Sequence, residues 1–184
     1  MTISVEDISQ SAETYFKKLD AFVAEHRLTK RDPSTIAWKV TDIDEFNDTL
    51  SGFLKSELVI QCHIGFVDKR YIASVVFKQP IYRNVSILKL MQRRPGSTDP
   101  VGLDHADFPV NNLSSLENEL KAKKVVKWSH ESNEVHGWIS VWFDGTEAKF
   151  VDHIVLDVGV KELQNITKRL GFDPKAVDDI QQSR

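Results

Sequence analysis

Cysteine is almost absent from this chain of 184 residues, in which Cys62 is the only one. A lone cysteine excludes an internal disulfide and a thiolate metal cluster. Long hydrophobic runs are also missing, and no stretch reaches the roughly 20 apolar residues that cross a bilayer. No basic start followed by an apolar run marks a secretion signal. We therefore expect no membrane partner and a location in the cytoplasm.

A large excess of one charge is the next feature that the sequence lacks. The net charge is −3, from 24 Lys and Arg against 27 Asp and Glu. A general nucleic-acid binder needs a strongly basic surface, so nucleic acid is not an expected partner. Hydrophobic residues make up 41% of the chain, which is enough to build a core. We expect one domain or two closely joined halves, as a monomer or homodimer.

Helical spacing of apolar residues appears in four segments. The first covers residues 5–26, where Ser4 is the expected N-cap. The second and third cover residues 42–55 and 113–123, and the last covers residues 161–170 near the end of the chain. The first helix carries an apolar stripe, which we expect to pack on the main body.

Short β-rich stretches fill the space between these segments. The expected strands are residues 35–40, 58–66, 71–77, 85–90, 102–110, 125–129, 138–143 and 148–151. Among them Gly102–Val110 stands out, because alternation places His105 and Asp107 on one face. Ala106, Phe108 and Val110 then lie on the other face. This pattern predicts that the apolar face packs in the core and that the face with His105 and Asp107 forms a polar site.

An internal duplication relates the two halves of the chain. With a shift of 70 positions Ile36 meets Ala106, and the apolar pattern of the following helix is also in register. Near the end of each half the shift is 60, and Lys89 meets Lys149. Each half is a strand, a helix and three further strands.

Two βαβββ units in tandem resemble the vicinal oxygen chelate superfamily, which includes glyoxalases and extradiol dioxygenases. The closer resemblance is to its YecM-like branch. The motifs that carry it are Thr35-Ile-Ala-Trp-Lys, Arg70-Tyr-Ile, Lys78-Gln-Pro-Ile81, Ser86-Ile-Leu-Lys-Leu90, Pro95-Gly96, Gly102-Leu-Asp-His105, Asp144-Gly145 and Lys149-Phe150. The resemblance implies an α+β fold in which the tandem units form a curved mixed sheet, with an added N-terminal helical segment.

The expected organisation has three parts. Residues 1–33 form the helical segment packed on the body. Residues 34–160 form the two-module domain, with modules at about 34–94 and 102–155. Residues 161–184 form a C-terminal helix and polar tail.

In that superfamily the first and last strands of each half supply the metal ligands. The resemblance implies that these positions are Thr35, Lys89, His105 and Lys149, with Met91 in place of Lys89 under another alignment. A typical member has His, Glu or Gln there, and only His105 is retained as a ligand. Two lysines repel a divalent cation, so a divalent metal is disfavoured and no cofactor is expected.

The same positions favour a degenerate metal site that binds a small anionic molecule between the modules. Cationic groups beside aromatic surface suit a carboxylate or phosphate compound. Asp107 would act as an internal counter-charge, with Ser140 on the same wall. The predicted ligand-binding residues are Thr35, Lys39, Lys89, His105, Asp107, Lys149, Trp138 and Trp142.

Two other functions remain open, and the sequence does not decide whether the protein is an enzyme. One is a metal-dependent enzyme of the glyoxalase or dioxygenase type that uses His105, with Lys89 and Lys149 as further catalytic candidates. The other is a non-catalytic protein-interaction module. His105 and Asp107 also fit a simple structural role as hydrogen-bonding partners on a half-solvated sheet.

Overall fold

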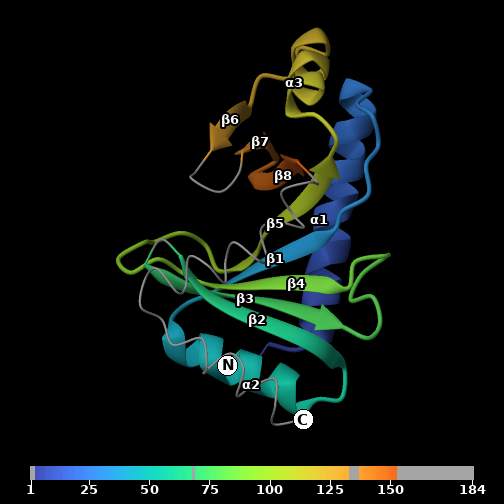
Figure 1. Ribbon diagram of the computed structural model, residues 1–184. Helices are drawn as coiled ribbons and strands as arrows, with labels where there is room; N and C mark the ends of the chain where they lie inside the picture. The colour runs from blue at the N-terminus through green and yellow to red at the C-terminus, as the bar shows by residue number, and fades with distance from the viewer. Residues whose placement is uncertain (1–2, 68, 133–136, 153–184) are drawn as a thin grey trace.

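The computed structural model describes residues 3–67, 69–132 and 137–152 (Figure 1). The expected segment 161–170 lies outside these residues. The elements are α1 (Val5–His26), β1 (Thr35–Val40), α2 (Ile43–Lys55), β2 (Val59–Val67), β3 (Arg70–Phe77), β4 (Ile87–Gln92), β5 (Gly102–Val110), α3 (Leu113–Ala122), β6 (Trp128–Ser132), β7 (Gly137–Phe143) and β8 (Thr146–Asp152).

Helix α1 begins where the sequence predicts. Ser4 Oγ accepts a hydrogen bond from the Asp7 N–H at 3.1 Å, and Asp7 Oδ2 accepts one from the Ser4 N–H at 2.9 Å. This reciprocal capping box satisfies two of the free N–H groups at the helix start. The apolar stripe is buried against the sheet and is not offered to a partner; it consists of Ile8, Ala12, Tyr15, Phe16 and Leu19.

The eight strands of the described residues form one mixed sheet in the order β2-β3-β4-β1-β5-β8-β7-β6. The first module consists of β1, α2 and β2–β4, and the second consists of β5, α3 and β6–β8. Strands β1 and β5 lie side by side and antiparallel, while β1–β4 and β5–β8 are parallel pairs. The predicted α+β fold of tandem βαβββ units is confirmed.

The strand register confirms the duplication. Ile36 is paired with Ala106, its own counterpart under the shift of 70. On either side Thr35 pairs with Asp107 and Ala37 with His105, so exchanging the two modules leaves the pairing unchanged.

The same register decides which residue of β4 corresponds to Lys149. Ala37 pairs with Lys89, and Asp107, the counterpart of Ala37, pairs with Lys149. Lys89 is therefore the structural counterpart of Lys149. Met91 pairs with Lys39 instead.

The helices cover one face of the sheet. Figure 1 shows α1 running along both modules, α2 beside β2–β4 and α3 beside β6–β8. The residues that this face buries alternate along the strands, as the period of two requires. They include Ile36, Trp38, Val40, Ala73, Val75, Leu88, Leu90, Ala106, Phe108, Val110, Ile139, Val141, Ala148 and Phe150.

One strand boundary differs clearly from its prediction. The sequence predicts a strand over residues 125–129, but β6 begins at Trp128. Lys124 has a left-handed backbone with φ of 56°, and the Val125 N–H donates to the Leu120 carbonyl at 3.0 Å. Val125 thus closes the end of α3 and is not available for strand pairing.

Candidate functional site

The face of the sheet opposite the helices carries a cluster of polar residues, here called the polar face. Directly paired residues of neighbouring strands point to the same face. One row runs through Lys89, Ala37, His105, Glu147 and Trp142. The neighbouring row runs through Thr35, Asp107, Lys149 and Ser140. Lys39 and Trp138 belong to the same face, two residues further along β1 and β7.

The structure therefore brings all eight predicted ligand-binding residues to one face. They come from β1, β4, β5, β7 and β8, so both modules contribute. Whether these residues bind a ligand stays a prediction at this point. Their contacts show which of them are available.

A β-bulge in β5 adds a residue that alternation alone does not place here. Ala37 pairs with His105 but Trp38 pairs with Leu103, so Asp104 is the extra residue. Asp104 Oδ2 lies 2.7 Å from His105 Nδ1, and Asp104 Oδ1 lies 2.6 Å from Lys39 Nζ. Burial would raise the pKa of the Asp104 carboxyl, but His105 and Lys39 outweigh it and hold this pKa well below its usual range.

Asp107 makes the second set of ionic contacts. Its Oδ2 lies 2.5 Å from Lys89 Nζ, and its Oδ1 lies 3.3 Å from His105 Nε2. The carboxylate is buried, which favours its neutral form, yet the charge of Lys89 and the contact with His105 lower its pKa. Asp107 is therefore ionised at neutral pH and balances Lys89.

Lys149 is held more loosely than the other two lysines. Its Nζ lies 3.8 Å from Glu147 Oε1, beyond hydrogen-bond distance, and 5.7 Å from the centroid of the Trp138 ring. A quarter of its side chain (25%) is exposed. Lys149 is thus the lysine of this cluster whose ammonium has no carboxylate oxygen within hydrogen-bond distance among the described residues.

On the polar face His63 Nδ1 of β2 lacks a hydrogen-bond partner within the described residues, and so do two buried atoms close to Lys149 and Asp107. They are Ser140 Oγ and His105 Nε2, the latter 3.3 Å from Asp107 without the alignment of a hydrogen bond. Ser140 is 1% exposed and is the cross-strand neighbour of Lys149. An unpaired buried polar group costs about 1–3 kcal/mol, so such atoms mark places where a water or ligand would bind.

Three residues of the polar face are able to offer ligand atoms to a metal. One donor atom each from Asp104, His105 and Glu147 lies within 4.8 Å of the others. Imidazole and carboxylate ligands suit several divalent metals. Against this, Lys39 occupies one oxygen of Asp104. Of the four positions that the family resemblance implies, only His105 belongs to this group.

Asp104 and Glu147 are the two residues of this group that sequence reasoning missed. Glu147 was open to detection, because it stands two positions before Lys149 on the same strand and therefore shares its face. Asp104 was not, because regular alternation places it on the core face. No helix in the described part of the chain is long and apolar enough to cross a membrane.

Comparison with known proteins adds information on the fold alone. No family model matches the chain, and no curated protein matches it. A structural-genomics structure titled Protein EC4020 superposes with a TM-score of 0.68 at 13% identity, covering 85% of this chain and 97% of that one. This likeness shows that the two chains share a fold.

Two further solved structures carry enzyme names. A methylmalonyl-CoA epimerase of Streptomyces coelicolor gives a TM-score of 0.47 at 11% identity, with 67% of this chain and 98% of that chain covered. A catechol 2,3-dioxygenase gives 0.43 at 16% identity, with 67% and 40% covered.

Proposed function

We propose that the polar face binds a small anionic molecule, with its negatively charged group between Lys149, Ser140 and His105. The observation that carries this proposal is the unpaired hydroxyl of Ser140, which is buried beside the loosely held ammonium of Lys149. A carboxylate or phosphate oxygen would satisfy both groups at once.

The paired lysines have a different role in this proposal. Lys39 and Lys89 already form ion pairs of 2.6 and 2.5 Å with Asp104 and Asp107. Each of them uses one ammonium donor and part of its charge on a carboxylate that it holds in place, so in this proposal Lys149 is the main cationic contact of the ligand.

Aromatic side chains supply the apolar side of the proposed site. Trp138, Ser140 and Trp142 alternate on β7 and so share the polar face. Trp142 is 37% exposed, and the Lys149 ammonium lies over the Trp138 ring. A ligand with a planar or apolar body beside its anionic group would contact these rings.

The test measures binding of inorganic phosphate and of acetate by calorimetry and by thermal shift. Saturable binding by the wild-type protein is expected, and Lys149→Met should weaken it by at least about tenfold. Ser140→Ala should weaken it by about threefold to tenfold, because one hydrogen bond to a charged ligand is lost.

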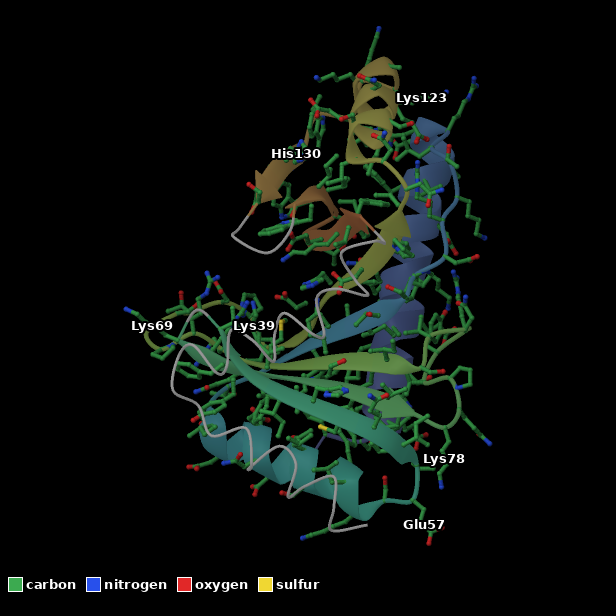
Figure 2. The ribbon with its side chains drawn as sticks, viewed as in Figure 1. Lys39, Glu57, Lys69, Lys78, Lys123 and His130 are labelled. Atoms are coloured by element: carbon green, nitrogen blue, oxygen red, sulfur yellow. The ribbon has the colours of Figure 1, made fainter. Side chains whose placement is uncertain are left out.

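Lys78→Met is the matched control, since Lys78 is exposed and lies away from the polar cluster, near the end of the molecule opposite Lys123 (Figure 2). It should leave the dissociation constants unchanged. Equal loss in Lys78→Met and Lys149→Met would indicate non-specific attraction and contradict the proposal.

A second candidate function is a metal-dependent enzyme of the glyoxalase or dioxygenase type. The closely spaced donor atoms of Asp104, His105 and Glu147 favour it. Elemental analysis and thermal shift with Mn²⁺, Zn²⁺ and Ni²⁺ test it. Stabilisation by a metal that disappears in Glu147→Gln but persists in Lys149→Met would support this function over anion binding.

The order of the family motifs supports a further assignment. We propose that the chain belongs to the YecM-like branch of the superfamily, and that it works in the cytoplasm. A role as a protein-interaction module is less well supported, because α1 buries the apolar stripe that a partner would bind.

A further inference from the structure

Tyr15 of α1 reaches from the helix-covered side into the backbone of the sheet. It is 3% exposed, and its hydroxyl accepts a hydrogen bond from the Ala106 N–H at 3.2 Å while donating one to the Glu147 carbonyl at 2.6 Å. The helix that carries Tyr15 precedes both modules in the chain. One of its side chains nevertheless completes the hydrogen bonding between β5 and β8.

The hydroxyl contacts an N–H and a carbonyl that face each other across the two strands. Ala106 pairs with Ala148 in a parallel arrangement, in which the N–H of one residue meets the carbonyl that precedes its partner. For Ala106 that carbonyl belongs to Glu147. Tyr15 thus links the facing backbone groups of β5 and β8 through its hydroxyl.

The groups that Tyr15 bridges belong to the main chain of the proposed site. The Ala106 N–H lies in the peptide that follows His105, and the carbonyl is that of Glu147 itself. His105 and Glu147 are also cross-strand partners on the opposite face. Any change in the separation of the two strands here alters the distance between these two side chains.

We infer that Tyr15 is a positioning residue, which sets the separation of His105 and Glu147 from behind the sheet. This inference rests on the proposed function, since it assigns Tyr15 a part in shaping the anion site. Tyr15 does not touch the ligand. Its action passes through the backbone of β5 and β8.

The packing of the Tyr15 ring fixes the place of its hydroxyl. The ring meets Phe16 edge-on with centroids 5.1 Å apart, and Phe143 with centroids 5.6 Å apart. Phenylalanine at this position would preserve both ring contacts and remove only the bridge. Tyr15→Phe is therefore a specific probe, and its effect is separable from a loss of core packing.

The experiment compares Tyr15→Phe with Phe143→Leu in the full chain. Phe143→Leu disturbs the same aromatic contact but touches no group of the polar face. Two quantities are measured: the ring-nitrogen NMR resonances of His105 in the ligand-free protein, assigned with a His105→Gln variant, and the dissociation constant of inorganic phosphate.

Tyr15→Phe should shift the His105 resonances and weaken phosphate binding by about fivefold to tenfold. Phe143→Leu should lower the melting temperature and leave both quantities near their wild-type values. Unchanged His105 resonances in Tyr15→Phe, or equal shifts in both variants, would overturn the inference. If the wild-type protein bound no phosphate, the proposed function would fail, whereas the His105 resonances would still decide the role of Tyr15.

Discussion

The first module contributes two lysines to the polar face, Lys39 and Lys89, and the second contributes two aspartates, Asp104 and Asp107. Each lysine is paired with one of the aspartates, at 2.6 and 2.5 Å. The modules have the same backbone plan but opposite charges at their junction. The two modules are thus complementary in charge where they meet. The same charge on both modules would make these contacts repulsive.

Equivalent positions of the two modules also differ in size. Ala37 in the first module corresponds to Asp107 in the second, and Thr35 corresponds to His105. Strand β1 lies between β4 and β5, so Lys89 must pass over Ala37 to reach Asp107. The small side chain of the first module leaves room for a contact that the second module supplies.

The largest expected effect comes from removing the lysine of the first module. Lys89→Met leaves the Asp107 carboxylate, whose side chain is 2% exposed, without its paired cation, so it should lower the free energy of unfolding by about 3–5 kcal/mol. Urea denaturation monitored by circular dichroism measures this. The double variant Lys89→Met/Asp107→Leu should recover part of the loss; if the double variant were the less stable, the pairing would not be the cause.

Removing the partner from the second module should cost less. Asp107→Asn leaves Lys89 without its counter-charge, but the lysine side chain is 33% exposed and water already screens part of its charge. We expect a loss of about 2 kcal/mol in the same urea experiment. An effect larger than that of Lys89→Met would contradict the asymmetry between the modules.

Acid should weaken the junction in a predictable direction. The folded state lowers the pKa of Asp104 and Asp107, so their contribution is fully present above the unfolded value of about 3.9 and is lost as the pH falls below it. Each aspartate adds at most about 1.4 kcal/mol per pH unit to the slope. Urea unfolding is measured at about pH 7, 5, 4 and 3. The free energy of unfolding should fall less steeply with decreasing pH for Asp107→Asn than for the wild type.

The smallest effect on stability is expected at Ser140. Its hydroxyl has no hydrogen-bond partner in the described ranges of the chain, so Ser140→Ala removes an unsatisfied group. The free energy of unfolding should stay unchanged or rise by up to about 1 kcal/mol. A clear loss of stability in ligand-free protein would show that an ordered water already satisfies this hydroxyl.

Most of the fold was open to prediction from the sequence. All eight strands and the three helices of the described chain overlap their predicted positions, because periods of two and 3.6 residues follow directly from burial of one face. The boundary at Val125 was wrong, because its N–H is used by the end of α3. That hydrogen bond leaves no mark on the apolar pattern.

Less of the candidate site was open to prediction. Alternation places His105, Asp107 and Lys149 on one face, as the structure shows. The alternation along one strand does not show that Lys39 and Lys89 form ion pairs, because their aspartate partners lie on another strand. Asp104 was missed because a bulge changes the face on which a residue lies.

The sequence by itself determined the two βαβββ modules, their equivalence and the division of the sheet into an apolar and a polar face, since each is a pattern along the chain. Only the tertiary structure decided which charges meet across β1, where the bulge turns Asp104, and that Tyr15 bridges β5 and β8. These contacts join residues far apart in sequence, and their strength depends on burial and exact separation. The pattern of residues along the chain gives neither the burial nor the separation of these groups.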